Sequence, residues 1–527
     1  MEPTADFNKL YNEWITSRTD DTVVFCYNDV EIRVGEINAL VNRYADELRQ
    51  RGIGPGKGVG FALPDCPEVF ALFFAVWRLG AYAVPLFPMI PDPMKVGVFS
   101  AARVVLAITA SAALESLAAE VRRQQAPFSL AAVGGEGASA FGTAIPVNDE
   151  ILPVPVSSRM PAMVAASSGT TGVPKIVMMD RGNIASALRC SAEMAPDYRP
   201  ESNGDWRSTL AFPLSTSGML VCAGLLFGGV TLVFSEDLSP VTYLSLTGKW
   251  GAQLLSAPPS YFETLCTLPG IDPCVAEKVT GIMTGMDFLS PSLLERLGKR
   301  FPQLQFCSVG YGLVETSTVF MVQKPEMKGD STGVQGSFLI AGGVTNEITV
   351  RDKNGAQAPD GTPGELWVRG PSVVREYAGN QEATQQAFVD GWFRTGDVAV
   401  KNGTDAMELL GRDKYLIKRG GKSVSPLMVQ EKITAIPGIR ECAVVGVPHP
   451  LYGQMIWAFV VPETSTDGIE KAVMKQCRET LPNYMVPDTV RFLQQLPRGR
   501  GAGKLDIEQL LRTAGEELAA MEEDQHG

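Results

Sequence analysis

The stretch "AASSGTTGVPKIVMMD" (residues 165–180) combines small hydroxylated residues with glycines and is closed by one lysine. Gly169 and Gly172 can adopt positive φ without steric cost, so successive backbone N–H groups can converge on one anion. Lys175 adds a positive charge that can contact a phosphate oxygen. Further hydroxyl donors come from Ser167, Ser168, Thr170 and Thr171. We therefore predict that this stretch binds phosphate groups.

The flanks of this stretch indicate where it lies in the fold. "PAMVAA" (161–166) and "IVMM" (176–179) are apolar and strand-like, which a solvated Ser/Gly linker would not be. We predict a loop between two strands. The spacing differs from that of a Walker P-loop, because Lys175 lies three residues after Gly172 and is followed by Ile176 rather than by Ser or Thr.

Length and composition exclude several classes of protein. A chain of 527 residues exceeds what one hydrophobic core usually organises, so we expect at least two domains. Apolar residues make up 45% and charged residues 20%, as in ordinary globular proteins. The net charge of −12 and the lack of a basic tract argue against nucleic acid or an anionic membrane as the main partner.

Cysteine and histidine usage narrows the chemistry further. The nine cysteines form no C-x-x-C pair, which favours a reducing compartment, and we expect a cytoplasmic protein without a membrane span. The most apolar stretch, 69–77, is too short to cross a bilayer. Because the chain has only two histidines, His449 and His526, a histidine metal cluster is excluded. A Ser-His-Asp triad would rest on His449, whose turn-like context favours a structural role.

Periodicity predicts an α/β fold with largely parallel sheets. Helical patterns precede strand-like runs repeatedly, at 34–52 before 58–63, at 67–80 before 81–86, and at 112–125 before 128–133. From about residue 340, short alternating strands separated by Asp-Gly and Asn-Gly turns predict a smaller β-rich subdomain. From 416 to 527 the pattern returns to helix and strand, which predicts a compact α+β domain.

Four further motifs follow the first stretch in order: "YGLVETS" (311–317), "GWFRTGDVA" (391–399), "GRDKYLIKRGGKSVSP" (411–426) and "GAGKLD" (501–506). Each alone is compatible with an ordinary turn. Together they resemble the adenylate-forming superfamily, which contains acyl-CoA synthetases, stand-alone adenylation enzymes and luciferases. The resemblance runs from about residue 20 to residue 512.

The resemblance implies a two-step reaction. A carboxylate attacks the α-phosphate of ATP to give an acyl-adenylate and pyrophosphate, and a thiol then displaces AMP to give a thioester. The implied cofactors are ATP, Mg²⁺ and either CoA or phosphopantetheine. The implied organisation is a large N-terminal adenylation domain (1–411) of layered sheets and helices, a hinge (412–415) and a mobile C-terminal lid domain (416–527).

By the same resemblance, individual residues acquire roles. The stretch from Ser167 to Lys175 holds the β- and γ-phosphates, and Glu315 is a Mg²⁺ ligand, as a hard oxygen donor. Asp397 and Arg412 hold the ribose, Tyr311 lies against the adenine, and Gly312 is a further nucleotide-binding residue. Lys504 matches the catalytic lysine, which stabilises charge on the α-phosphate in the transition state.

The second half-reaction is expected to need a domain rotation. The resemblance implies a pivot at Lys414 and places the glycines of the "RGGK" loop, Gly420 and Gly421, on the side where the thiol arrives. It also implies that the acid is held by segments that include Ser215, Thr216, Ser217, Gly285, Met286, Asp287 and Gly310. These segments are mostly small and apolar, which favours an aliphatic or aryl acid.

The sequence departs from the superfamily pattern at four places. Ile176 stands where Gly is usual, Arg181 where His is frequent, and Val314 where a Thr hydroxyl is expected, while Ser215 or Thr216 replaces an aromatic-His pair. No acidic residue occurs in 208–224, which disfavours an α-amino acid.

Three functions therefore stay open at this stage. The first is an acid–CoA ligase. The second is a stand-alone adenylation enzyme that loads an acyl or peptidyl carrier protein. The third is a nucleotide-binding protein without catalysis.

Overall fold

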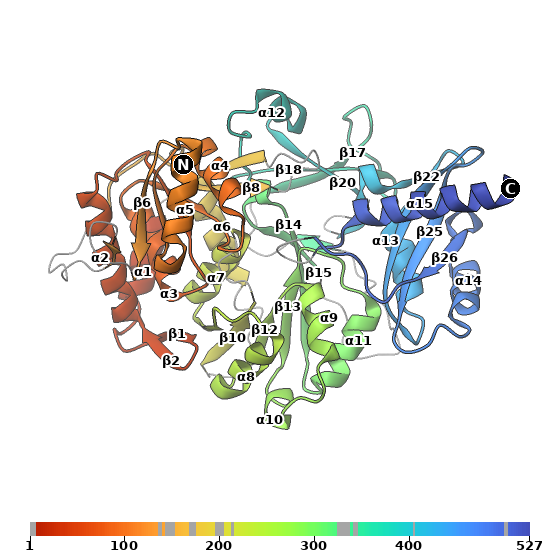
Figure 1. Cartoon of the computed structure of the whole chain (residues 1–527), viewed down its shortest axis with the longest axis horizontal. Helices are drawn as coiled ribbons and strands as arrows, with labels where there is room; N and C mark the ends of the chain where they lie inside the picture. Colours follow the sequence, from red (N-terminus) through yellow and green to blue (C-terminus); the bar gives the residue numbers. More distant parts are fainter. Residues whose placement is uncertain are drawn as a thin grey trace.

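The computed structural model describes ten segments of the chain, and every statement below concerns these residues: 7–134, 140–142, 153–167, 175–194, 205–211, 216–323, 338–340, 346–403, 406–499 and 504–526. They form a large N-terminal domain and a smaller C-terminal domain, which lies at the right in Figure 1. The predicted α/β fold is confirmed.

A seven-stranded sheet occupies the N-terminal part of the chain. Its order is β7-β6-β5-β3-β4-β8-β9, and all neighbours are parallel except β8 and β9. The strands are β3 (Gly58–Ala62), β4 (Tyr82–Pro85), β5 (Val104–Ala110), β6 (Ser129–Val133), β7 (Ala140–Phe141), β8 (Pro161–Ser167) and β9 (Lys175–Asp180). The helices of this part are α1 (Phe7–Thr16), α2 (Val34–Gln50), α3 (Pro67–Arg78), α4 (Asp92–Ala101) and α5 (Ser111–Gln124). The predicted helix–strand units are therefore present.

A 14-stranded sheet runs through the middle of the molecule. Its parallel part is formed by β1 (Val23–Tyr27), β10 (Trp206–Leu210), β11 (Val230–Phe234), β12 (Leu254–Ser256), β13 (Gly281–Gly285) and β14 (Phe306–Gly312), with β2 (Val30–Arg33) antiparallel at one edge. Its helices are α6 (Arg181–Met194), α7 (Thr216–Phe227), α8 (Pro240–Trp250), α9 (Pro259–Thr267), α10 (Pro273–Ala276) and α11 (Pro291–Arg300).

The predicted β-rich segment continues this sheet rather than forming a sheet of its own. Its strands are β15 (Val319–Gln323), β16 (Phe338–Ile340), β17 (Glu347–Arg351), β18 (Pro363–Arg369), β19 (Phe388–Val389), β20 (Trp392–Asn402) and β21 (Ala406–Arg412), and helix α12 (Gln381–Ala387) lies between two of them. All these strands pair antiparallel, and β16 links β15 to β21. The motifs at 311–317 and 391–399 thus lie on one continuous sheet.

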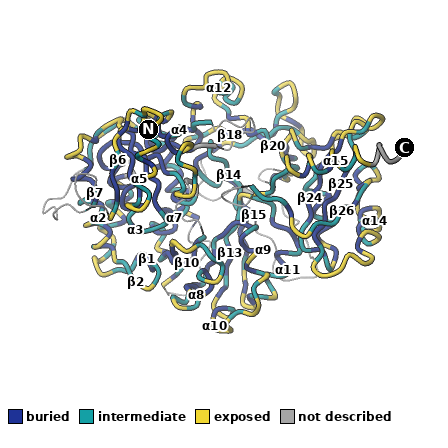
Figure 2. Tube along the Cα trace, in the orientation of Figure 1, coloured by how far each residue is buried: buried dark blue, intermediate teal, exposed yellow. Residues whose placement is uncertain are grey.

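Buried helices fill the space between the two large sheets, as the dark tube in Figure 2 shows. Helix α3, "PEVFALFFAVWR", is apolar on every side, and 11 of its residues are buried. A helix of this composition must lie inside a core, because it has no polar face for water. It packs in one hydrophobic cluster with residues of α6 and α7. The indole N–H of Trp77 donates to the Ala162 carbonyl at 2.8 Å, which ties the helix to β8.

The C-terminal domain has a five-stranded sheet with hydrophobic clusters on both faces. Its strands are β22 (Ile417–Arg419), β23 (Lys422–Val424), β24 (Ile439–His449), β25 (Gly453–Pro462) and β26 (Thr489–Phe492), and its helices are α13 (Pro426–Thr434), α14 (Ile469–Thr480) and α15 (Ile507–His526). Gly420 and Gly421 have φ of 54° and 77° and join β22 to β23. Two successive positive φ angles are those of a type I′ hairpin turn.

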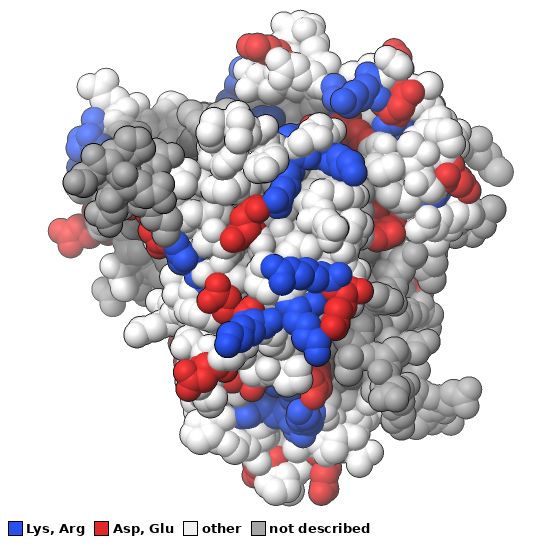
Figure 3. Space-filling view, turned by 90° about the vertical axis from the view of Figure 1, so that its right-hand side faces the viewer, with Lys and Arg blue, Asp and Glu red and all other residues white. Residues whose placement is uncertain are grey.

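The surface of the C-terminal domain carries charges of both signs. Figure 3 views this side of the molecule, where Lys and Arg side chains gather near the middle and Asp and Glu side chains lie beside them. In the described residues, no helix has the length and apolar character needed to cross a bilayer. All nine cysteines lie in described segments and are free thiols.

Candidate active site

A cavity of about 2570 Å³ contains most of the described candidate residues. Its walls come from the carboxyl ends of β13 and β14, from β20 and β21, and from parts of the C-terminal domain. Ligand sites of open α/β sheets lie at the carboxyl ends of parallel strands, because the loops that diverge there leave a crevice. Among the candidate residues, those lining this cavity are Lys175, Gly285, Met286, Asp287, Gly310, Tyr311, Gly312, Glu315, Asp397, Arg412, Lys414 and Lys504.

The predicted phosphate loop begins and ends on paired strands. Ser167 is the last residue of β8 and lies opposite Lys175, the first residue of β9. The two predicted flanking strands are therefore confirmed. The loop residues Ser168, Gly169, Thr170, Thr171 and Gly172 lie outside the described residues, as does Ser215.

Asp397 and its two neighbours form a compact polar group. Arg412 lies opposite Asp397 in the register of β20 and β21, and its Nε is 2.9 Å from Oδ1 of that carboxylate. The Tyr311 hydroxyl donates to Oδ2. Burial raises the pKa of Asp397, an effect that the Arg412 guanidinium opposes. A carboxylate offers about four acceptor positions, so two stay available for a ligand such as a pair of hydroxyls.

Glu315 lies in the short 3₁₀ helix η3 (Val314–Thr316), directly after β14. Its Oε1 accepts a hydrogen bond of 2.9 Å from the Tyr377 hydroxyl, and its backbone carbonyl accepts from the Val374 N–H at 2.8 Å. The described residues contain no cluster of three or more His, Cys, Asp or Glu side chains suited to a metal ion. A single carboxylate beside substrate phosphates still fits Mg²⁺, which usually keeps several waters and takes one or two protein carboxylates.

Three glycines allow close backbone approach at the strand ends. A Cβ on Gly285 would lie 2.6 Å from the Gly310 carbonyl oxygen, and one on Gly312 would lie 2.3 Å from that of Thr318. A Cβ on Gly310 would lie 2.9 Å from Val319. Larger residues there would push the strands apart.

The acid-side candidates next to these glycines have different exposures. Met286 has φ of 70° and is 45% exposed. The Asp287 carboxylate accepts from the Phe288 N–H at 2.8 Å, a local turn contact. Thr216 and Ser217 begin α7, and their side chains lie outside the described residues.

The departures from the family pattern have structural explanations in two cases. Arg181 is 2% exposed and donates to the Trp77 carbonyl at 2.9 Å, so it belongs to the helical core and not to the cavity. The Ile176 side chain packs against the hydrophobic cluster that includes Val84 and Ala107. Both residues therefore support packing.

Thr316 lies beside Val314, but its hydroxyl cannot replace the one that Val314 lacks. Thr316 is fully buried, and its hydroxyl contacts the Leu313 carbonyl at 2.9 Å, the Thr318 carbonyl at 3.0 Å and the Leu313 N–H at 2.9 Å. It has no capacity left for a phosphate. Ser308, 3% exposed, lines the cavity and stays a candidate.

In the C-terminal domain, Lys504 lies at the cavity, whereas the turn at Gly420 and Gly421 lies outside it. Lys504 is exposed and lines the cavity, and its carbonyl accepts from the Gly499 N–H at 2.8 Å. Gly420 and Gly421 are exposed and do not line the cavity. Lys414 lies in the 3₁₀ helix η4 (Asp413–Tyr415), with its ammonium 3.8 Å from Glu508.

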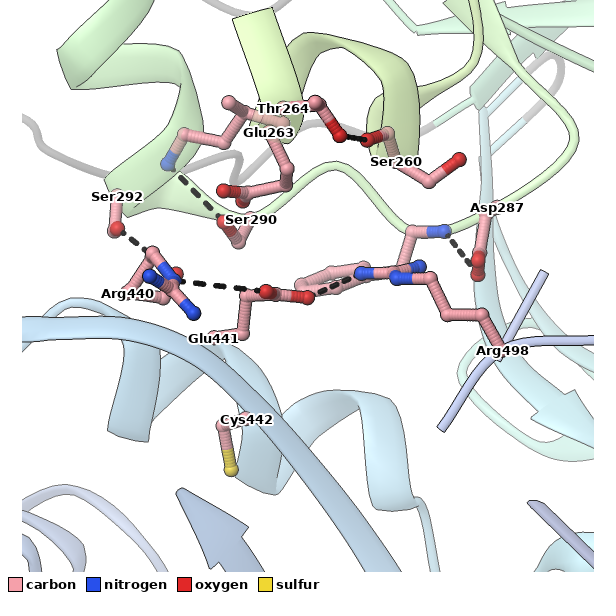
Figure 4. A network of polar contacts seen from close by, with 12 residues as sticks. Ser260, Glu263, Thr264, Asp287, Ser290, Ser292, Arg440, Glu441, Cys442 and Arg498 are labelled. Carbon is pink, nitrogen blue, oxygen red and sulfur yellow. Dashed lines mark hydrogen bonds and ion pairs between the residues drawn. The ribbon is translucent and has the colours of Figure 1, made fainter. Parts of the chain in front are cut away.

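A polar contact between the domains lies at another wall of the same cavity, shown in Figure 4. The Arg440 carbonyl accepts from Ser292 at 3.3 Å and from Arg296 at 3.5 Å. Two carboxylates, Glu263 from α9 and Glu441 from β24, face one another across the boundary in this view.

Each of these carboxylates has an arginine partner in its own domain. Glu263 pairs with Arg296 at 2.6 Å, and Glu441 pairs with Arg498. Burial raises the pKa of Glu263 to about 7, and Glu441 adds to this rise while Arg296 opposes it.

Sequence reasoning missed Tyr377 and the residues of this contact. None belongs to a motif with fixed spacing, and their partners are distant in sequence, so no local signal could have identified them. His449, the only histidine considered for a triad, accepts from the Leu451 and Tyr452 N–H groups and stacks on the Tyr452 ring. Its predicted structural role agrees with these contacts.

Comparisons with known proteins agree with the fold and the motifs. The profile of the AMP-binding enzyme family matches residues 12–378, and that of the AMP-binding enzyme C-terminal domain matches 429–504. A feruloyl-CoA synthase of Amycolatopsis sp is 28% identical over 478 residues, which is 89% of this chain and 91% of that protein. A long-chain-fatty-acid–CoA ligase, FadD13, of Mycobacterium tuberculosis is 26% identical over 499 residues, with coverage of 89% and 91%.

Among solved structures, the amide bond synthetase McbA from Marinactinospora thermotolerans superposes with a TM-score of 0.83 at 23% identity, covering 96% of this chain and 99% of that one. This likeness concerns the fold. The family profile spans well over half of the chain. The matched residues include the predicted phosphate loop, Glu315 and the ends of β13 and β14 that line the cavity. The chain therefore belongs to the AMP-binding enzyme family of the adenylate-forming superfamily.

Proposed function

We propose that the protein is an ATP-dependent acid–CoA ligase. The observation that carries this proposal is that Lys504, Glu315 and the Asp397–Arg412 pair, which come from both domains, line one cavity at the carboxyl ends of parallel strands. The names of the two relatives support a CoA thioester as the product. Within the chain, we assign 1–411 to the adenylation domain, 412–415 to the hinge and 416–527 to the lid.

In the first step, a carboxylate oxygen of the acid attacks the α-phosphorus of ATP, and the bond to the β-phosphate oxygen breaks to release pyrophosphate. Asp397 and Arg412 hold the ribose, because the Asp397 carboxylate keeps two acceptor positions beside its protein partners. Tyr311 and Gly312 border the adenine. Lys504 stabilises the charge that builds on the α-phosphate oxygens.

Glu315 and Lys175 serve the phosphate end of the nucleotide. The Glu315 Oε1 atom is engaged by Tyr377, and no partner is found for Oε2 within the described part of the chain, so this oxygen is available to Mg²⁺. The ion supplies neutralising charge for the phosphates when bound. Lys175 and the loop from Ser167 to Gly172 hold the β- and γ-phosphates.

In the second step, the sulfur of CoA attacks the acyl carbon, the bond to the AMP oxygen breaks, and the thiol proton is lost to solvent. Lys504 must leave the site first, because it occupies the side from which the thiol approaches. Rotation about Lys414 would exchange it for the turn at Gly420 and Gly421, which is exposed in this arrangement. The acid is aliphatic or aryl, since the inner wall includes Met194, Leu225 and Met283.

The test is ATP–pyrophosphate exchange across a panel of aliphatic, aryl and amino acids, followed by thioester formation with CoA. We expect exchange with at least one aliphatic or aryl acid, and consumption of the CoA thiol with the same acid. Exchange without thiol consumption would support a carrier protein as the acceptor instead. Lack of exchange across the whole panel would contradict the proposed activity.

A further inference from the structure

Tyr377 lies where the phosphate-loop strand meets the Glu315 turn. It belongs to the segment between β18 and α12, is 5% exposed and lines the cavity. Its backbone forms a bridge with Val177 of β9, and its N–H donates to the Thr384 hydroxyl at 2.9 Å. The following N–H, of Ala378, donates to Ile176. The position of this side chain is therefore fixed by its backbone on both sides.

The hydroxyl of Tyr377 fixes one oxygen of Glu315. Oη donates to Oε1 at 2.9 Å, and the Glu315 backbone is held by the Val374 N–H three residues earlier in the same segment. The Tyr377 hydroxyl is the donor of this bond, because an ionised carboxylate only accepts. A hydrogen bond from a neutral donor to a carboxylate is stronger than one between neutral groups. Because this hydrogen bond occupies Oε1, the second carboxylate oxygen of Glu315, Oε2, is left for another ligand.

The ring of Tyr377 serves a different charge. The Lys175 ammonium lies 4.5 Å from the ring centroid, within the range of a cation–π contact. Phe388 packs edge-on against the ring at 5.6 Å, which restricts its rotation. One side chain thus contacts the cation of the phosphate loop with its face and the carboxylate of the next motif with its hydroxyl.

We propose that Tyr377 is a positioning residue that sets Glu315 and Lys175 at the separation required by a Mg²⁺–triphosphate group. The inference rests on the proposed function, since it assigns the metal side to Glu315 and the phosphate side to Lys175. Hydrogen-bond partners of metal ligands typically change metal affinity by about 10- to 100-fold when removed. Removing the hydroxyl should change Mg²⁺ affinity through Glu315, and removing the ring should change phosphate binding through Lys175.

The test is calorimetric titration of ATP into the full-length protein without acid, so that no turnover occurs, in EDTA and over a series of free Mg²⁺ concentrations. For Tyr377→Phe we expect the dissociation constant for ATP in EDTA to stay within about two-fold of wild type. The Mg²⁺ concentration that gives half of the maximal enhancement of ATP binding should be about 10-fold higher. For Tyr377→Leu we expect the same change and, in addition, about three-fold weaker binding in EDTA, because Lys175 loses the ring.

Two controls separate positioning from general damage. Tyr452→Phe removes a hydroxyl from a tyrosine that is 51% exposed in the C-terminal domain, and it should behave as wild type. In a Glu315→Gln background, Tyr377→Phe should cause no further change in the Mg²⁺ dependence, because both changes act on one interaction.

The inference is overturned if Tyr377→Phe leaves the Mg²⁺ dependence unchanged, or if it weakens binding equally in EDTA and in Mg²⁺. A Glu315→Gln variant that keeps the wild-type Mg²⁺ dependence would instead overturn the metal role of Glu315 in the proposed function. Absence of ATP binding by the wild-type protein would overturn both.

Discussion

The nucleotide side of the cavity and the contact between the domains are built differently. On the nucleotide side, Asp397 is held by Arg412 and Tyr311, and Glu315 is held by Tyr377. These partners lie on the large sheet or on segments packed against it. Apart from Arg412, which begins the proposed hinge, these partners belong to the N-terminal domain and do not depend on where the lid lies.

At the domain contact, the ion pairs stay within each domain. Glu263 pairs with Arg296 on the N-terminal side, and Glu441 pairs with Arg498 on the C-terminal side. Separating the domains breaks the hydrogen bonds to the Arg440 carbonyl but leaves no buried charge without its partner. Breaking a buried ion pair typically costs about 3 to 5 kcal/mol, a cost that this arrangement avoids. The comparison indicates a fixed nucleotide side and a contact suited to repeated opening.

The largest expected effect comes from removing the charge that the lid contributes. Lys504→Ala should lower the rate of ATP–pyrophosphate exchange by about 100- to 1,000-fold, as loss of a group that stabilises transition-state charge does. Thioester formation from a pre-made acyl-adenylate should stay within about two-fold of wild type, because no charge builds at phosphorus in that step. Full exchange activity in the variant would show that Lys504 has no catalytic role.

The next prediction tests the fixed side. Asp397→Ala should raise the dissociation constant for ATP by about 10- to 100-fold, because two hydrogen bonds to a charged acceptor are lost together. Asp397→Asn keeps one acceptor oxygen and should have a smaller effect. Calorimetric titration of ATP measures both, and an unchanged constant for the Ala variant would contradict the ribose role.

The third prediction concerns the movable contact and its dependence on pH. Glu263 faces Glu441 and Arg498 from the lid and Arg296 from α11, and its pKa is raised to about 7. When the lid moves away and water returns, this pKa should fall toward its ordinary value. The arrangement seen here is therefore favoured while Glu263 is protonated. It loses this advantage as the pH rises through about 7.

Energy transfer between probes can measure this shift. Cys274 is exposed on the N-terminal domain, and Thr464→Cys supplies a second exposed thiol on the lid. In the wild-type background, we expect the share of molecules in this arrangement to fall a few-fold from pH 6 to pH 8. In Glu263→Gln, this share should be insensitive to pH. Glu295→Gln removes an exposed carboxylate of α11, the helix that carries Arg296, and serves as the matched control. A pH response that persists in Glu263→Gln would assign the effect to another group.

The sequence predicted the parts of the molecule that depend on local patterns. The strands on either side of 168–174 follow from apolar runs beside a glycine-rich segment. The predicted helix–strand units needed only periodicity.

The remaining features depend on contacts between distant segments. The β-rich segment joins the large sheet because β16 pairs with both β15 and β21, and no local pattern specifies that register. Tyr377 meets Glu315 across 62 residues, and Arg440 meets Arg296 across 144. The same holds for the Thr316 hydroxyl, whose backbone partners Leu313 and Thr318 become known only from the structure.

The smallest expected effect tests whether the fixed side contains a defect. Val314 lines the cavity and packs against the large hydrophobic cluster. Val314→Thr adds one donor, worth about 1 kcal/mol in a net hydrogen bond, but it also places a hydroxyl against apolar neighbours, which costs a similar amount. The exchange rate should therefore stay within about five-fold of wild type.

Ser308→Ala in the wild-type background should lower the rate more than in the Val314→Thr background if Ser308 supplies the missing donor. A gain above ten-fold in Val314→Thr alone would show that no neighbour replaces the hydroxyl and that this side of the site is less complete than its internal contacts indicate.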